Sequence, residues 1–284
     1  MTIWTDLADT AFAVDFVDAG GLRTRSLRAG QGEPVIFLHG TSGHLEAFIR
    51  NLPAHARHYD CHAIDMMGHG YTDSPPDAYR IRGYVDHLVA YLDAVGIDRA
   101  HFVGESLGGW VAARLAVDFP DRVGKLTLVA PGGTVANPEV MERIKSSTRA
   151  AVESDDIGLT RKRLELLMYD PTINVTDELV DIRHAIYHRE SFVNAIDRLL
   201  ALQELVNREP DLLTVEQMNV ITAPTLIVWG LENPFGKVPE AQRMHESIPG
   251  SRLELFEDCG HWPQHEHAER FNALNLAFLA GEAR

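Results

Sequence analysis

The chain has 284 residues, 45% of them hydrophobic, and its 26 basic and 41 acidic side chains give a formal charge of −15. This length and composition exclude a disordered or fibrous protein, and they suffice to bury a core without disulfides or structural metal. The negative charge argues against nucleic acid or an anionic membrane surface as the main partner, because both require a basic surface.

Two cysteines, Cys61 and Cys259, lie far apart and form no C-x-x-C pair, which is typical of a reducing compartment. The first ten residues contain acidic side chains and no apolar run, so they do not resemble a secretory signal. No stretch reaches the roughly 20 apolar residues of a membrane span. We therefore expect a soluble cytoplasmic protein.

The first half of the chain predicts a βαβα pattern. A hairpin is expected over residues 13–28, with Gly20 and Gly21 at its turn. Short apolar runs that read as buried strands follow at residues 35–38, 61–64, 101–103 and 126–129, and helical periodicity covers residues 84–95 and 110–119. We expect a doubly wound, mainly parallel sheet, with the hairpin at one edge.

This pattern stops near Pro131 and resumes with strand-like runs at residues 224–229 and 252–256. The stretch between them contains only charged amphipathic segments, such as residues 161–168 and 177–187. We therefore expect a core domain built from residues 1–134 and 221–284. Residues 135–220 should form a helical cap over that core.

The strongest chemical signal is a G-x-S-x-G motif at residues 104–108, centred on Ser106. It runs out of an expected strand and into an expected helix, which is the context of a nucleophile elbow. The alternative is a glycine-rich turn that contains an incidental serine. The match on both flanks favours a nucleophile.

A serine hydroxyl needs a base to attack a carbonyl, and His261 is the candidate because it follows the last expected strand and precedes a final helix. A rival interpretation takes Cys259, His261, His265 and His267 as a metal-binding tract. Their irregular spacing and the lack of a partner cluster argue against it. We expect neither a metal nor a cofactor.

Attack by Ser106 creates an oxyanion, which backbone N–H groups must stabilise. One donor is expected at Leu107, just after the nucleophile at the start of a helix. The other is expected at Thr41, with Ser42 beside it, in the His-Gly-Thr-Ser-Gly loop that follows the strand at 35–38.

These features together resemble the α/β-hydrolase superfamily over essentially the whole chain. The general match lies in residues 37–43, 65–70 and 104–108 and in the Cys-Gly-His-Trp run at 259–262. The narrower resemblance is to the meta-cleavage product hydrolases, which cleave a carbon–carbon bond in 2-hydroxy-6-oxohexa-2,4-dienoates. It rests on residues 120–126, 130–133, 169–171, 176–179, Arg183, 259–262, Glu266, Phe271 and Asn272.

The resemblance implies roles for two further residues. Arg183, on an amphipathic segment of the cap, corresponds to an arginine that holds the substrate carboxylate, a task that suits a bidentate guanidinium. Taken alone, it would read as a solvated surface residue. Trp262 resembles the family's active-site tryptophan, although a core aromatic residue is an equal interpretation.

The sequence departs from the family pattern where the triad acid belongs, three positions beyond Gly230, because Asn233 stands there. An asparagine can hold the imidazole tautomer but supplies no charge. Glu232 supplies both if the loop turns it inward, and we favour it slightly. A more distant alternative is Asn137 or Glu139.

The second departure is Glu105, where these hydrolases usually have an asparagine. Its carboxylate either acts on the base through its charge, donates a hydrogen bond as a buried acid, or contacts a cap residue. The change leaves serine chemistry intact and opens the question of the substrate.

The leading hypothesis is therefore a serine-dependent carbon–carbon bond hydrolase of aromatic catabolism, acting on a small dienoate and assembled as a dimer. A carboxylesterase or lactonase that uses the same Ser-His site is the alternative, since the fold alone does not choose. A non-catalytic ligand-binding protein is a third hypothesis, motivated by Asn233.

Overall fold

The structure, a computed structural model, describes residues 3–77 and 79–282. Within these residues eight strands form one sheet in the order β1-β2-β4-β3-β5-β6-β7-β8. The strands are β1 (Phe12–Ala19), β2 (Leu22–Ala29), β3 (Glu33–Leu38), β4 (Tyr59–Ile64), β5 (Ala100–Glu105), β6 (Val123–Val129), β7 (Thr225–Gly230) and β8 (Arg252–Phe256). Strands β3 to β8 are parallel. This confirms the expected doubly wound sheet.

The expected hairpin forms the antiparallel edge of the sheet. Gly20 and Gly21 both have positive φ, 65° and 91°, which suits a tight turn whose twist matches the two strands. Strand β1 pairs with β2, and β2 continues antiparallel onto β4. The hairpin therefore lies at the end of the sheet away from β8.

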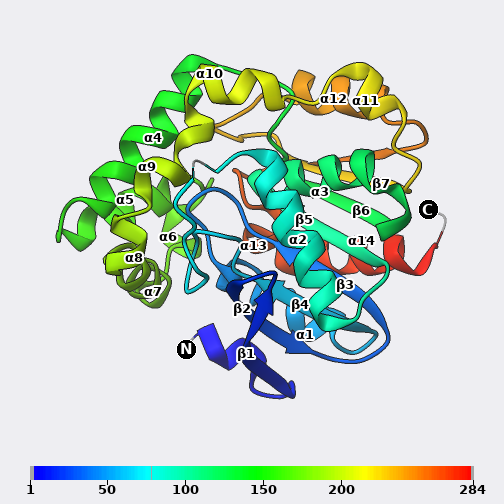
Figure 1. Cartoon of the computed structure of the whole chain (residues 1–284), viewed down its shortest axis with the longest axis horizontal. Coiled ribbons are helices and arrows are strands. Elements are labelled where there is room, and N and C mark those ends of the chain that lie inside the picture. Colours follow the sequence, from blue (N-terminus) through cyan, green and yellow to red (C-terminus); the bar gives the residue numbers. More distant parts are fainter. Residues whose placement is uncertain (1–2, 78, 283–284) are drawn as a thin grey trace.

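Helices cover both faces of the sheet (Figure 1). Helices α2 (Ile81–Val95), α3 (Leu107–Asp118) and α12 (Val238–Ser247) share one buried apolar cluster, and α1 (Leu52–His55) and α14 (Ala268–Ala280) share the other. Neighbouring strand residues alternate between the clusters: Ile36 belongs to the first and Phe37 to the second. Because each strand is buried on both sides, it reads as a continuous apolar run.

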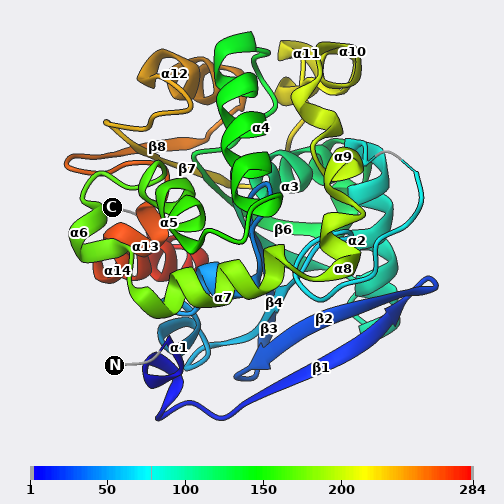
Figure 2. The ribbon, with the colours of Figure 1, turned by 90° about the vertical axis from the view of Figure 1, so that its left-hand side faces the viewer.

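Between β6 and β7 the described chain contains helices and no strand. The helices are α4 (Pro138–Val152), α5 (Ile157–Glu165), α6 (Pro171–Asn174), α7 (Asp177–Tyr187), α8 (Glu190–Val193), α9 (Ile196–Leu199), α10 (Leu205–Arg208) and α11 (Val215–Asn219). Figure 2 shows α4, α5, α7, α8 and α9 as a helical layer on one side of the molecule. Side-chain caps begin five of the eight helices, from Asn137, Asp156, Asp170, Thr176 and Thr214.

Helix α5 differs from the expected segment at residues 161–168, because it begins earlier and ends at Glu165. Its last turn tightens, with the Leu167 N–H donating to the Leu164 carbonyl at 2.9 Å. The Leu167 carbonyl then accepts the backbone N–H of His261 at 2.7 Å. The helix therefore ends where the chain hydrogen-bonds to the loop after β8. Apolar periodicity in the sequence does not predict this end. No helix in the described part of the chain is long and apolar enough to cross a membrane.

Candidate active site

Ser106 lies at a sharp turn between β5 and α3. Its backbone is strained, with φ 52° and ψ −110°, and its N–H donates to the Val129 carbonyl at 2.9 Å. The flanking glycines are required by space: a Cβ on Gly104 would lie 2.4 Å from the Gly108 carbonyl oxygen, and one on Gly108 would lie 2.1 Å from that of Leu38. The residues of the G-x-S-x-G motif therefore form the strained strand-to-helix turn that the sequence predicts.

His261 lies on the loop between β8 and α13 (Pro263–Glu266), and this loop is held at several points. The Glu266 carboxylate accepts the backbone N–H groups of Gly260 at 3.0 Å and Trp262 at 3.1 Å. The backbone N–H of His261 donates to Leu167 of the helical insertion. The imidazole is thus fixed between the core and the inserted helices.

The ring of His261 is oriented by Asn233. His261 Nδ1 lies 2.9 Å from Asn233 Oδ1, and the same oxygen accepts the Phe235 backbone N–H at 3.0 Å. A backbone N–H requires an acceptor, so the amide oxygen of Asn233 faces both groups and Nδ1 must carry the proton. Nε2 is therefore the basic nitrogen, as general base catalysis requires.

The slight preference for Glu232 as the partner of His261 was wrong. The Glu232 side chain is exposed, and its Oε2 accepts the Cys259 backbone N–H at 2.9 Å. The loop after β7 directs the Asn233 side chain toward His261. The Glu232 side chain instead bonds to the neighbouring loop at Cys259. The more distant alternatives also lie elsewhere, because Asn137 caps α4 and Glu139 is exposed.

Glu105 contacts the other side of the imidazole. Its carboxylate is 1% exposed, and Oε1 lies 3.1 Å from His261 Nε2. Its Oε2 has no hydrogen-bond partner among the described residues and packs where a side chain on Gly40 would stand. The Glu105 carboxyl group therefore lies beside the nitrogen of His261 that Asn233 leaves free.

The residues expected to form the oxyanion hole lie on two elements, Thr41 and Ser42 in the loop after β3 and Leu107 on α3. Thr41 lines the cavity beside Ser106, and Leu107 begins α3, where backbone N–H groups lack helical partners. Ser42 is fully buried and holds other groups: its carbonyl accepts Arg183 Nη1 at 2.8 Å, and its hydroxyl accepts the Tyr187 hydroxyl at 3.1 Å.

Arg183 is buried, which excludes its interpretation as a solvated surface residue. It is 1% exposed, and its Nε and Nη2 atoms have no partner among the described residues. Its guanidinium carbon lies 5.7 Å from the ring centroid of Trp262, which is also buried. Both side chains line the same cavity as Ser106 and His261. Unsatisfied buried guanidinium donors are costly, so this cavity favours an anion.

Two adjoining cavities meet at Ser106, Ile144, Phe235 and His261. We call the first the arginine chamber. Its other lining residues are Gly40, Thr41, Gly43, Glu105, Arg163, Leu167, Arg183 and Trp262. We call the second the outer chamber. Its other lining residues are Ala130, Pro131, Gly132, Gly133, Thr134, Val135, Asn137, Val140, Met141, Gln203, Arg208, Trp229, Asn233 and Glu240.

Sequence reasoning missed Arg163, which also lines the arginine chamber. It lies on α5, is 4% exposed, and belongs to the run Arg161-Lys162-Arg163, which reads as a charged surface segment. The one signal in the sequence was its position next to Leu164, an apolar residue that is buried in the structure.

The rival metal tract is not assembled into one cluster. Cys259 Sγ lies 3.9 Å from a Glu266 carboxylate oxygen, while His265 Nε2 lies 3.0 Å from the Asn174 carbonyl and His267 Nε2 lies 2.9 Å from that of Asp258. These side chains point to different partners, and His261 is directed to Asn233 and Glu105.

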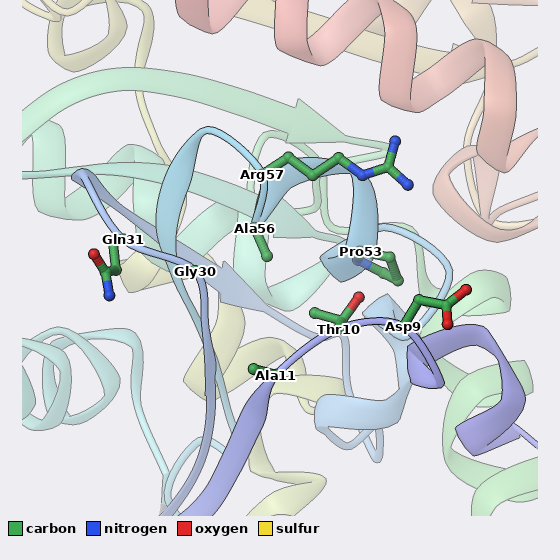
Figure 3. A pocket seen from close by; sticks show the side chains of 8 residues that line it. All are labelled: Asp9, Thr10, Ala11, Gly30, Gln31, Pro53, Ala56 and Arg57. Atoms are coloured by element: carbon green, nitrogen blue, oxygen red, sulfur yellow. The ribbon is translucent and has the colours of Figure 1, made fainter.

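A further hollow lies outside this region, between the start of β1, the turn after β2 and α1 (Figure 3). Asp9 and Arg57 are the charged side chains that line it. It contains neither Ser106 nor His261, so it is separate from the candidate site.

A serine at a strained strand-to-helix turn, with a histidine after the last strand and a parallel sheet behind both, defines an α/β-hydrolase. A sequence profile described as the alpha/beta hydrolase fold matches residues 33–156. The chain is 35% identical over 263 residues to a 2-hydroxy-6-oxo-6-phenylhexa-2,4-dienoate hydrolase of Burkholderia cepacia, covering 89% of each chain.

Two further similarities agree. A 2-hydroxy-6-oxononadienedioate/2-hydroxy-6-oxononatrienedioate hydrolase of Pseudomonas sp. is 33% identical, covering 89% of this chain and 90% of the relative. The structure of a meta-cleavage product hydrolase from Pseudomonas fluorescens IP01 has a TM-score of 0.82 at 28% identity, covering 95% of this chain and 98% of that one. The chain therefore belongs to the α/β-hydrolase family, in the group of the meta-cleavage product hydrolases, and is a hydrolase.

Proposed function

We propose that the protein hydrolyses the carbon–carbon bond of a 2-hydroxy-6-oxohexa-2,4-dienoate, a product of ring-opening aromatic catabolism, with Ser106 as nucleophile and His261 as general acid and base. The observation that carries this proposal is the buried, partly unpaired guanidinium of Arg183 in the same chamber as Ser106 and His261. An ester hydrolase acting on neutral substrates has no use for that charge. A dienoate carboxylate would satisfy it with charge-assisted hydrogen bonds.

The reaction begins with the carboxylate on Arg183 and the C6 carbonyl beside Ser106. Ketonisation moves the enol proton to carbon, so that the leaving fragment can depart as a stabilised dienolate, and His261 serves this transfer. Ser106 then attacks C6, and the N–H groups of Thr41 and Leu107 stabilise the oxyanion. Breaking the C5–C6 bond releases a 2-hydroxypenta-2,4-dienoate, and water frees the carboxylic acid from the serine.

Asn233 and Glu105 divide the work that one triad carboxylate usually performs. Asn233 fixes the tautomer of His261 through Nδ1 but is neutral. Glu105 brings a carboxyl group to Nε2 instead, where its charge stabilises the imidazolium that forms during catalysis. For attack, Nε2 must exchange this contact for the Ser106 hydroxyl.

The outer chamber is proposed to receive the C6 substituent. Val140, Met141, Ile144, Trp229 and Phe235 give it an apolar lining, which suits an alkyl or aryl group. The Arg208 side chain at its border is engaged, since Nε donates to the Val135 carbonyl at 3.0 Å and Nη1 to that of Leu202 at 3.3 Å.

Residues 135–220 are proposed to act as the cap that selects the substrate. Ile144 of α4 and Arg163 of α5 line the arginine chamber, and α7 contributes Arg183. The core contributes Ser106 and His261, so a substrate must lie between the two parts.

A direct comparison of substrates tests the proposal. The purified enzyme is assayed with 2-hydroxy-6-oxo-6-phenylhexa-2,4-dienoate, by loss of its yellow dienolate absorbance, and with p-nitrophenyl esters of short carboxylic acids. We expect kcat/KM for the dienoate to exceed that for the esters by at least about 100-fold. Faster turnover of the neutral esters would favour the carboxylesterase or lactonase alternative, and binding without turnover of either would favour a non-catalytic protein.

We further propose a cytoplasmic homodimer. The edge strand β1 exposes Phe12, Val14 and Phe16, and such an unpaired apolar strand invites pairing with a second copy. The two cysteines are free and buried, which agrees with a reducing compartment. Light scattering at micromolar concentration tests the dimer: the mass of a monomer, 31.6 kDa, would contradict it.

A further inference from the structure

The arginine chamber contains a second buried cation whose hydrogen bonds are incomplete. Arg163 Nε donates to the Thr148 hydroxyl at 3.2 Å, and the guanidinium carbon lies 5.7 Å from the centroid of the Phe235 ring. Nη1 has no hydrogen-bond partner among the described residues. Thr148 and Phe235 therefore fix the guanidinium, while one of its donor nitrogens stays unpaired.

The charges of the chamber do not balance as they stand. Arg163 and Arg183 bring two guanidinium groups, and Glu105 is the one carboxylate among the residues that line the chamber. Arg183 also has unpaired donors, at Nε and Nη2. Burial lowers the pKa of Arg163 and outweighs Tyr187 and Glu105, which raise it, while the positive charge of Arg183 lowers it further. The charged form of Arg163 is thus opposed by its burial and by Arg183. A bound monoanion would relieve both.

We propose that Arg163 and Arg183 together form a two-guanidinium site for one substrate carboxylate, with Arg163 as the specificity-determining second arm. This rests on the proposed function in taking that carboxylate as C1 of the dienoate. One monocarboxylate would neutralise the excess charge of the chamber and supply acceptors to nitrogens on both side chains. The site selects a planar carboxylate, and it discriminates against esters and amides of the same acid.

A simpler role for Arg163, as the partner of Glu105, fits the contacts less well. Glu105 Oε1 faces His261, and its Oε2 is unpaired although Arg163 lines the same chamber. A guanidinium placed to neutralise that carboxylate would bond to Oε2. Both groups instead keep unused hydrogen-bonding atoms, as expected if a ligand comes between them.

The test compares Arg163→Gln, Arg163→Lys and the control Arg143→Gln, which removes one exposed cation from the adjacent helix α4. Two readouts are needed: KM and kcat for the phenyl dienoate, and the inhibition constant of hexa-2,4-dienoate, which keeps the C1 carboxylate but has no ketone to cleave, against hydrolysis of p-nitrophenyl acetate. We expect Arg163→Gln to raise KM and the hexa-2,4-dienoate inhibition constant at least about tenfold, with kcat changed less than about threefold. Arg163→Lys should recover part of the loss, and Arg143→Gln should match the wild type.

The proposal is overturned if Arg163→Gln weakens inhibition by hexa-2,4-dienoate no more than Arg143→Gln does, or if it weakens inhibition by the neutral hexa-2,4-dienamide equally. Far-ultraviolet circular dichroism and the melting temperature show whether each variant is folded. If Arg163→Gln does not fold, Arg163→Lys decides: it must weaken inhibition by hexa-2,4-dienoate more than inhibition by hexa-2,4-dienamide, and an equal effect overturns the site. The inhibition readout needs no dienoate turnover. An enzyme that does not hydrolyse the phenyl dienoate, but loses affinity for hexa-2,4-dienoate when Arg163 is replaced, would refute the proposed function and retain the carboxylate site.

Discussion

His261 Nε2 lies 3.1 Å from a carboxylate oxygen of Glu105, on the side of the ring opposite to Asn233. The negative charge that accompanies the base therefore comes from the residue just before Ser106, and the loop after β7 provides a neutral acceptor. The imidazole is held at Nδ1 by Asn233, and the Glu105 carboxyl group lies beside Nε2.

Glu105→Gln should lower kcat by roughly 10- to 100-fold, because it removes the charge that stabilises the imidazolium while keeping a side chain of similar size. Steady-state kinetics with the phenyl dienoate measures this loss. Glu139→Gln, at an exposed position on α4, is the control. A kcat equal to that of the wild type would show that the charge of Glu105 does not assist the base.

Asn233→Asp should keep kcat within about tenfold of the wild type, because the acceptor for His261 Nδ1 is retained. Asn233→Leu should lower kcat by roughly 10²- to 10⁴-fold, since the ring then loses the acceptor that selects its tautomer. Glu232→Gln is the matched control and should have little effect on kcat, because its side chain bonds to the Cys259 N–H and not to the base. If Glu232→Gln lowered kcat more than Asn233→Leu does, Glu232 and not Asn233 would be the residue that orients His261.

Arg183→Gln should raise KM for the dienoate by about 100-fold and change kcat little, because the lost interaction is made with the substrate carboxylate in both ground and transition states. The same variant should bring the specificity constants for the dienoate and for p-nitrophenyl acetate closer together. If the dienoate KM is unchanged, the arginine does not hold the carboxylate.

Buried histidines should make the fold sensitive to acid. Burial lowers the pKa values of His55 and His87 to about 4, and that of His265 to about 3. The unfolded chain binds protons at these groups near pH 6.5 and the folded chain does not, so stability is present above that pH and is lost as pH falls toward 4. Each such histidine contributes a slope of about 1.4 kcal/mol per pH unit within that window.

His55 is the histidine to test. Its Nδ1 lies 2.7 Å from the Asn51 carbonyl and its Nε2 lies 2.9 Å from the Asn275 amide nitrogen, so the neutral ring satisfies both. His55→Gln should reduce the pH slope of the unfolding free energy between pH 4 and 6.5 by about one proton, as measured by urea denaturation. His58→Gln, at an exposed position, is the control. Equal slopes in the two variants would contradict the assignment.

The core of the fold was predictable because its local signals agree. Buried parallel strands are continuous apolar runs, and the glycines at 20 and 21 and at 104 and 108 stand where the backbone needs them. The end of α5 was not predictable, because it depends on a hydrogen bond between Leu167 and the distant His261. Local periodicity does not contain that information.

Ser106 and His261 could be predicted because each lies in a local sequence motif. Residues whose role depends on the direction of the side chain were harder to predict. Glu232 and Asn233 are neighbours, and only the turn of the loop determines which one faces the imidazole. Arg163 lies in a run of basic residues, and its burial follows from the packing of α5 against α4 and α7 and from its contact with Phe235, not from its own sequence. Only the structure shows that Arg163 Nη1 lacks a hydrogen-bond partner among the described residues and that Arg183 lines the same cavity.

Mixing the Ser106→Ala variant with the phenyl dienoate in a stopped-flow spectrometer tests the central claim most directly. The account predicts that the variant binds the substrate, retains a bound dienolate absorbance and forms no 2-hydroxypenta-2,4-dienoate, while Arg183→Gln added to it weakens binding. Formation of product at the wild-type rate would contradict the role of Ser106 and with it the proposed mechanism.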